Sequence, residues 1–334
     1  LQPNCLVNSR LGLSIEEDSD IDFKTLGDNQ LGDKKEEFPW QSPATVAHSW
    51  GFHALEDEWK STTTLLHSLI GNVSLNGNMM LNIGPRANGQ VPFEIKERLL
   101  EMGSWIKVHG ESIYGAQAFD LPKNQHDWGK ITCKTERNKT KLYLHIYNWP
   151  LNKQIPITGV IDQPKKAYLL SDKDQLALDF THNEALTLVD LHGQQADPYV
   201  SVVVLEYDQH PRIKEGLVAQ SVYGGYALTP HKANKIEGDD FILSKKKFGS
   251  IPERVVIKNK SRYEWSFFAG EALELKTDVS YSFATESGQG NLRIKLENQE
   301  LNHEFETTRK VVGEPNSNWQ IQGFESFRMG ELNI

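Results

Sequence analysis

The sequence has little cysteine and no long apolar run, and each absence excludes a class of protein. Its 334 residues include 2 cysteines, Cys5 and Cys133, which could form one bridge but provide neither a disulfide scaffold nor a cysteine-rich metal site. No apolar segment approaches the roughly 20 residues that a membrane-spanning helix needs. We therefore expect no membrane insertion.

Positive charge is also scarce. Lys and Arg number 36 against 45 Asp and Glu, which gives a net charge of −9. Phosphate groups would be repelled, so we expect neither nucleic acid nor an anionic membrane surface as a partner. No signal peptide is visible, but the chain opens at "LQPNC" without an initiating Met and ends abruptly at "FRMGELNI". We expect it to be a piece of a longer sequence.

Aromatic residues are plentiful, with 8 Trp, 10 Tyr and 14 Phe. Such side chains stack well on sugar rings, although they fill cores more often. The stretch "PWQSPATVAHSWGF" (39–52) suggests a substrate wall built from aromatic planes. A hydrolase would need a carboxyl group there, whereas Gln41 carries an amide that cannot give up a proton. The pattern leaves a sugar-processing site and a mere binding surface both open.

Residues 1–117 alternate strand and helix patterns. "NCLVNSRLG" reads as a short buried strand, and "NMMLNIG" as a strand buried on both faces, as in a parallel sheet. Between them Ser61 is a candidate N-cap for a helix with an apolar stripe, and a second helix runs from Pro92 to Gly110. This order predicts an α/β fold, specifically part of a (β/α)8 barrel.

Short alternating strands replace this pattern from about residue 118. We expect an antiparallel β-sandwich over 118–208. The third segment, 209–334, begins with a linker candidate at 209–216. It reads as a second β-sandwich-like segment, and carbohydrate binding is one open role for it.

Blocks in the first segment carry a family resemblance. They are "LQPNCLVNSRLG", "DFKTLGDNQ", "PWQSPATVAHSWGF" and, most specifically, "NGNMMLNIGPRANGQVPFEIKERLLEMGSWIKVHGESIYG". Over residues 1–117 the chain closely resembles glycoside hydrolase family 29, the α-L-fucosidases. The pair Asn8-Ser9 departs from the family's usual Asn-Asp.

The resemblance implies the C-terminal part of an irregular (β/α)8 barrel followed by one or two antiparallel β-sandwich domains. It implies an exo-α-L-fucosidase that releases terminal fucose from glycans by retaining double displacement, without metal or organic cofactor. The family's nucleophile, an Asp in a "W-F-D-G"-like strand, is absent here, so we expect it upstream. An N-terminal half or a second chain would then complete the barrel, with a homo-oligomer as another possibility. The expected compartment is secreted, periplasmic or lysosomal-type.

The resemblance also assigns roles to individual residues. Arg10 matches an Arg that contacts fucose, against a surface ion pair as the ordinary alternative. Trp50 matches an aromatic residue that packs on the C6 methyl of fucose, with core packing an equal alternative. Trp40 is either structural or flanks the leaving group, and His48 could contact sugar hydroxyls.

The general acid is the weakest point of the resemblance. One branch of the family places it at the position of Gln41, and another at Gly27, and neither residue has a carboxyl group. Among the carboxyls nearby, Asp28 is the best candidate because it lies in the "LGDNQ" block. Gln41 is then an engineered change, a natural variant beside another acid, or the mark of a homologue that binds fucose without hydrolysing it. An inactive fragment is a further alternative.

Overall fold

The computed structural model describes residues 4–12, 21–119, 121, 126–238, 241–243, 254–256, 260–270, 272–283, 289–311 and 321–334. The chain divides into two compact units, Leu1–Phe268 and Ala269–Ile334, and each is described by itself. The boundaries expected at 117/118 and 208/209 stay predictions.

A small parallel sheet opens the first unit. Its order is β1 (Lys24–Thr25), β2 (Trp40–Thr45) and β3 (Gly77–Asn82), and all of its pairs are parallel. A parallel bridge between Asn8 and Phe23 extends it by one position, next to the short helix η1 (Ser9–Leu11). The expected parallel α/β arrangement is therefore present.

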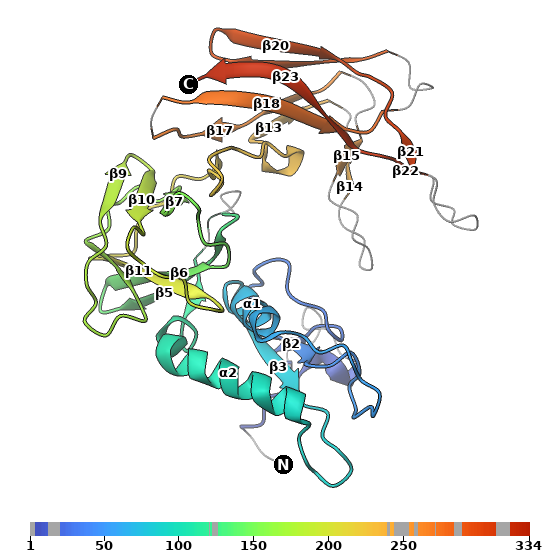
Figure 1. The fold of residues 1–334 in the computed structure, drawn as a ribbon, viewed down its shortest axis with the longest axis vertical. Helices are drawn as coiled ribbons and strands as arrows, with labels where there is room; N and C mark the ends of the chain where they lie inside the picture. Colours follow the sequence, from blue (N-terminus) through green and yellow to red (C-terminus); the bar gives the residue numbers. More distant parts are fainter. Residues whose placement is uncertain are drawn as a thin grey trace. The chain divides into compact units, whose positions relative to one another are not determined.

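Helix α1 (Thr62–Val73) connects β2 to β3, and α2 (Phe93–His109) follows β3 (Figure 1). The Ser61 side chain accepts a hydrogen bond from Thr64 N, which confirms the predicted N-cap. Pro92 directly precedes the first residue of α2, as expected at a helix start. Helix α2 ends at His109 with Gly110 as its C-cap, as predicted, and the short helix η2 (Gly110–Ser112) follows it.

The two faces of the sheet differ in what covers them. Side chains of Met79 and Leu81 pack against the cluster formed by Leu65, Leu66 and Ile70 of α1. On the opposite face Met80 is 49% exposed, whereas Pro43 and Thr45 of β2 are buried there. The expectation that "NMMLNIG" is buried on both faces is therefore wrong, because helix α1 covers one face only. "NCLVNSRLG" is not a buried strand either, since Leu6 is 70% exposed.

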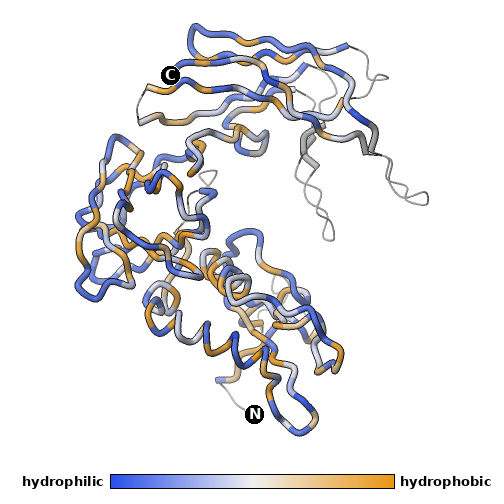
Figure 2. The backbone as a smooth tube through the Cα atoms, in the orientation of Figure 1, coloured by the Kyte–Doolittle hydropathy of each residue, from blue (hydrophilic) through white to orange (hydrophobic). Residues whose placement is uncertain are grey.

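An antiparallel sandwich follows the second helix. A five-stranded sheet has the order β4 (Gln117–Ala118), β5 (Gly129–Glu136), β6 (Lys139–Ile146), β11 (Ser201–Tyr207) and β8 (Lys166–Leu169). A three-stranded sheet has the order β7 (Gln154–Thr158), β10 (Leu186–Asp190) and β9 (Phe180–Asn183). Residues from both sheets form one core around Trp128, which is fully buried. Colouring by hydropathy shows apolar and polar segments interspersed along the backbone (Figure 2).

Shorter pairs complete both units. In the first they are β12 (Leu217–Val218) with β17 (Ser266–Phe267), β13 (Lys235–Glu237) with β16 (Arg262–Glu264), and β14 (Phe241–Leu243) with β15 (Arg254–Val256), and the helix η3 (Pro230–Lys232) lies among them. In the second unit they are β18 (Glu274–Tyr281) with β23 (Glu325–Asn333), β19 (Asn291–Leu296) with β20 (Gln299–Glu304), and β21 (Lys310–Val311) with β22 (Ile321–Gln322).

The two cysteines do not form the bridge that their number allows. Cys5 is free and exposed, whereas Cys133 is free and buried. Within the described ranges, none of the helices has the length and apolar character needed to cross a membrane.

Candidate functional site

The carboxyl ends of parallel strands meet at one edge of a sheet, and binding sites of such sheets form there. Arg10 follows the bridge at Asn8, the turn 26–30 follows β1, and residues 46–52 follow β2. Asn82 is the last residue of β3. These segments therefore share the edge at which the sequence predicted a sugar site.

Arg10 is oriented by the turn that follows β1. Its Nη2 donates to Asp28 Oδ1 at 2.7 Å and to the Leu26 carbonyl at 2.6 Å. Asn8 Oδ1 accepts from Arg10 N at 2.8 Å, which fixes the backbone from which the side chain projects. The Arg10 and Asp28 side chains are 48% and 58% exposed. An exposed ion pair adds little stability, so its main effect here is to set the direction of the guanidinium.

Lys60 and Asn29 form a second contact with the same turn. Lys60 Nζ donates to Asn29 Oδ1 at 3.0 Å and to the Thr45 carbonyl at 2.7 Å. Asn29 Oδ1 also accepts from Thr45 N at 3.0 Å. The turn after β1 is thereby tied to the last residue of β2.

Trp50 lies in the segment that follows β2. Asn82 Nδ2 donates to the Trp50 carbonyl at 2.5 Å, which ties this segment to the end of β3. Gly84 has φ +42°, and a Cβ there would lie 3.2 Å from the same carbonyl. Both of these contacts involve the Trp50 backbone and not its side chain. Trp50 is 37% exposed, so its ring is accessible to a ligand.

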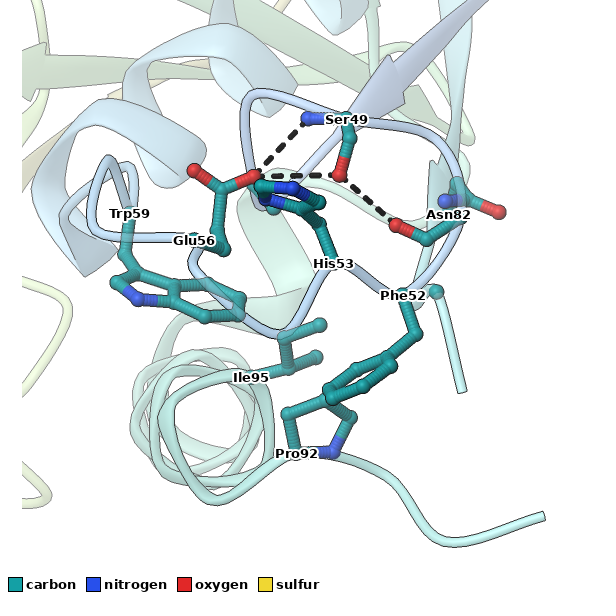
Figure 3. Close-up of a pocket in the computed structure, with 11 residues that line it drawn as sticks. Ser49, Phe52, His53, Glu56, Trp59, Asn82, Pro92 and Ile95 are labelled. Atoms are coloured by element: carbon teal, nitrogen blue, oxygen red, sulfur yellow. Dashed lines mark hydrogen bonds between the residues drawn. The ribbon is translucent and has the colours of Figure 1, made fainter. Parts of the chain in front are cut away.

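A small pocket lies beside this segment (Figure 3). Phe52, His53, Trp59, Pro92 and Ile95 line it, together with the polar residues Ser49, Glu56 and Asn82.

The Glu56 carboxylate fixes the loop beside this pocket. It accepts from Ser49 N and Ser49 Oγ, both at 3.2 Å, and from Glu58 N at 3.1 Å. Desolvation raises the pKa of Glu56, but the bonds from Ser49 and Glu58 outweigh it and leave this pKa below its ordinary value. Glu56 is therefore suited to hold the loop and not to donate a proton.

His48 lies on the exposed side of the same loop. Its Nδ1 is 3.6 Å from Glu58 Oε2, and the two side chains are 79% and 77% exposed. None of the described contacts brings His48 to Arg10 or Asp28, so its assignment as a sugar contact stays a prediction.

Trp40 is placed in the packed face of the sheet. It is 1% exposed, and its Nε1 donates to the Leu75 carbonyl at 3.1 Å. A ring enclosed in this way has no surface for a substrate. The packing therefore supports the structural alternative that was weighed for this residue.

Gln41 faces the opposite side of β2. Its Nε2 donates to Thr25 Oγ1 at 3.2 Å. It is the second residue of β2 and precedes the strand's last residue, Thr45, by about 13 Å of strand rise. Asp28 is bonded to Arg10, whereas Gln41 is paired with Thr25, the last residue of β1. Both catalytic assignments stay predictions.

A larger cavity of about 360 Å³ lies beside the connection from β1 to β2. Glu36 lines it with 17% of its side chain exposed, 3.9 Å from Lys24 and 3.7 Å from Lys34. In the ranges that the structure describes, no cluster of His, Cys, Asp or Glu could hold a metal ion.

The sequence analysis did not identify Asn29, Lys60, Asn82 or Glu56 as site residues. Asn29 offered one signal, since Asn tolerates the left-handed backbone that it adopts at φ +53°. Lys60 offered none, because its partners are distant in the sequence and only the fold brings them together.

Comparison with known proteins finds a family match over the first third of the chain. Residues 1–111 match a family model described as alpha-L-fucosidase. The alpha-L-fucosidase of Dictyostelium discoideum is 29% identical over 177 residues, which are 52% of this chain and 38% of that protein. The plasma alpha-L-fucosidase of Homo sapiens is 33% identical over 123 residues, which are 35% of this chain and 25% of that protein. The chain therefore matches well under half the length of these curated relatives.

Solved structures agree with this result. Alpha-L-fucosidase isoenzyme 1 from Paenibacillus thiaminolyticus is 31% identical with a TM-score of 0.55, over 61% of this chain and 50% of that one. The alpha-L-fucosidase of Vibrio sp. strain EJY3 has a TM-score of 0.66 at 23% identity, over 99% of this chain and 55% of that one. The latter likeness speaks for the fold alone. The family resemblance and the fold class, a partial barrel followed by β-domains, are confirmed.

Proposed function

Because residues 1–111 match the alpha-L-fucosidase family model, we propose that this protein is an exo-α-L-fucosidase that releases terminal α-L-fucose from glycans. The observation that carries the proposal is the family match over these residues, at whose sheet edge Arg10 and Asp28 lie 2.7 Å apart. A guanidinium fixed in this way can donate to sugar hydroxyls and steady a carboxylate. The exposed ring of Trp50 offers a flat apolar surface for the fucose methyl group.

The proposed reaction is a retaining double displacement. A carboxylate attacks the anomeric carbon, a second carboxyl group protonates the leaving oxygen, and water then hydrolyses the glycosyl-enzyme ester. We assign the nucleophile to a barrel segment outside these 334 residues, in an N-terminal half or a second chain. The exposure of Met80 on β3, at 49%, supports such a partner.

For the general acid we propose Asp28 over Gln41, because Asp28 carries a carboxyl group and an amide cannot donate a proton. Asp28 follows β1 and is bonded to Arg10, whereas the Gln41 amide is bonded to Thr25. The test compares Asp28→Asn and Gln41→Glu in the complete enzyme, on an activated aryl fucoside and on a natural fucosyl glycan. An acid matters most for a poor leaving group, so Asp28→Asn should lower kcat on the glycan by about 10²- to 10⁴-fold and on the aryl fucoside much less.

The expected result for Gln41→Glu is a change of only a few-fold on both substrates. Asp57→Asn serves as the matched control, because Asp57 is exposed and lies outside the proposed acid position. A large gain on the glycan from Gln41→Glu would instead assign the acid position to residue 41. Equal losses from Asp28→Asn on both substrates would remove Asp28 from that role.

A fucose-binding homologue without catalysis is the second candidate, and the amide of Gln41 is the observation that favours it. Calorimetric titration of the complete protein with fucose separates the two. Binding without release of fucose from either substrate class would support the binding protein, whereas turnover of the aryl fucoside would exclude it.

We further propose a secreted, periplasmic or lysosomal-type compartment. The plasma alpha-L-fucosidase of Homo sapiens, 33% identical over 123 residues, supports this proposal. Localisation of the full-length protein by cell fractionation tests it, and recovery in the cytosol alone would contradict it.

A further inference from the structure

The ammonium group of Lys60 is saturated with hydrogen bonds to protein. Its Nζ donates to the Thr45 carbonyl at 2.7 Å, to Asn29 Oδ1 at 3.0 Å and to Thr45 Oγ1 at 3.2 Å. An ammonium has three N–H donors, so these acceptors use all of them. Lys60 therefore has no donor left for a substrate or a proton relay, and its role is positional.

The backbone of Lys60 is fixed independently of its side chain. Lys60 N donates to the Val46 carbonyl at 2.9 Å, and the Lys60 carbonyl accepts from Arg98 Nε at 2.7 Å. The next residue, Ser61, caps helix α1. Loss of the ammonium alone therefore leaves the start of the helix in place.

On the other side of this contact, Asn29 holds an unusual backbone conformation. Its φ is +53°, in the left-handed region that non-glycine residues seldom adopt. Its N donates to the Pro43 carbonyl at 2.9 Å, and its Oδ1 accepts from Thr45 N and Thr45 Oγ1 as well as from Lys60. Such a conformation persists when the surroundings over-determine it, as these bonds do.

The turn held in this way also presents Asp28 to Arg10. Leu26 N donates to the Gln41 carbonyl at 3.0 Å at the start of the turn, and Arg10 binds Leu26 O and Asp28 Oδ1 on its outer side. Asp28 and Asn29 are adjacent, so a shift of Asn29 moves the carboxylate that orients Arg10.

We propose that Lys60 is a positioning residue that acts through Asn29 to hold the turn 26–30, and with it the pair of Arg10 and Asp28, at the carboxyl edge of the sheet. The proposal rests on the proposed fucosidase function for its catalytic meaning. Its structural content, that the ammonium holds this turn, stands without that function.

The test uses Lys60→Met, which removes the ammonium but keeps a long apolar stem, in the complete enzyme. Hydrogen exchange of the backbone amides in the turn 26–30 should accelerate by about tenfold or more, while exchange within helix α1 stays unchanged, because the turn opens locally. Lys60→Arg keeps a cation and should restore part of the protection. Lys96→Met, at an exposed position on helix α2, is the matched control and should change neither segment.

The second measurement is the kinetics on an aryl fucoside. Since a misplacement of about 1 Å at a reacting site can cost about 10²-fold, Lys60→Met should lower kcat/KM by about ten- to a hundred-fold, with partial recovery in Lys60→Arg. Faster exchange together with this loss supports the proposal. The proposal would be overturned if exchange in the turn did not change, or if it accelerated equally in the turn and in helix α1. Faster exchange in the turn with an unchanged kcat/KM would overturn it as well.

The two proposals fail in different ways. An unsubstituted complete enzyme without fucosidase activity would end the proposed function. Hydrogen exchange would then still decide whether Lys60 holds the turn.

Discussion

At the residue scale, the indole of Trp40 sets the closest packing in the parallel sheet. A Cβ added to Gly77 would lie 2.1 Å from Trp40 Cζ2, and one added to Gly32 would lie 2.2 Å from Trp40 Cη2. We expect Gly77→Ala to lower the free energy of unfolding by about 1–3 kcal/mol, because the buried ring must move within a filled core. Urea denaturation of the two proteins measures the difference.

Gly71→Ala is the matched control for this substitution. Gly71 lies inside helix α1, and a Cβ there would meet nothing within 4 Å. Alanine favours the helix over glycine, so this variant should gain about 0.5–1 kcal/mol. If the two variants changed stability by the same amount, the contact between Gly77 and the Trp40 ring would not be the cause.

At the scale of the element, the stability of helix α1 depends on the hydrogen bond made by its N-cap residue, Ser61. Ser61 Oγ accepts from Thr64 N at 3.1 Å. Ser61→Ala leaves that amide without a partner, so we expect a loss of about 0.5–2 kcal/mol in urea denaturation. Ser104→Ala, at an exposed position within helix α2, should be neutral or slightly stabilising, and an equal loss there would contradict the capping explanation.

Elements with strong local signals were predicted well from the sequence. The cap at Ser61 and the apolar stripe of α1 both appear in the structure, because each depends on neighbouring residues. The division of the sandwich into a five-stranded and a three-stranded sheet was not predicted, because strand pairing joins residues that are distant in the sequence. The exposure of Met80 was also missed, because burial depends on which parts of the fold cover a strand.

The candidate site also contains residues that the sequence indicated and a contact that it did not. Arg10 and Trp50 were found through sequence blocks, and both lie at the carboxyl edge of the sheet. The contact of Lys60 with Asn29 joins residues 31 positions apart, so no local pattern announces it.

At the scale of the whole molecule, buried histidines make stability depend on pH. His145 on β6 is fully buried, and its Nε2 lies 3.0 Å from Thr132 Oγ1. Burial, with a smaller effect of the neighbouring His109, lowers the pKa of His145 to about 3. The unfolded chain has an ordinary pKa of about 6.5 there. Below pH 6.5 the unfolded state therefore binds a proton that the folded state does not, and stability is lost as the pH falls toward 3.

The expected loss is at most about 1.4 kcal/mol per pH unit for this one residue. Urea denaturation between pH 7.5 and 4.5 should show a steeper decline for the unsubstituted chain than for His145→Gln. His48→Gln is the control, because the His48 side chain is 79% exposed and is not desolvated by folding. An identical pH slope in the chain with and without His145 would contradict this account.

The proposed activity requires the barrel segment that carries the nucleophile. Among the described residues the parallel sheet has β1 and β3 at its ends, and Met80 on β3 is 49% exposed. Parallel sheets are normally buried on both faces, so this exposed side chain is a place where a further barrel segment would pack. We therefore expect the isolated 334-residue chain to release no fucose from an aryl fucoside. The complete enzyme, or this chain supplied with the missing barrel segment, should release fucose. Full activity from a preparation that gives a single band at 37.9 kDa under denaturing conditions would contradict this prediction and would place the nucleophile within this chain.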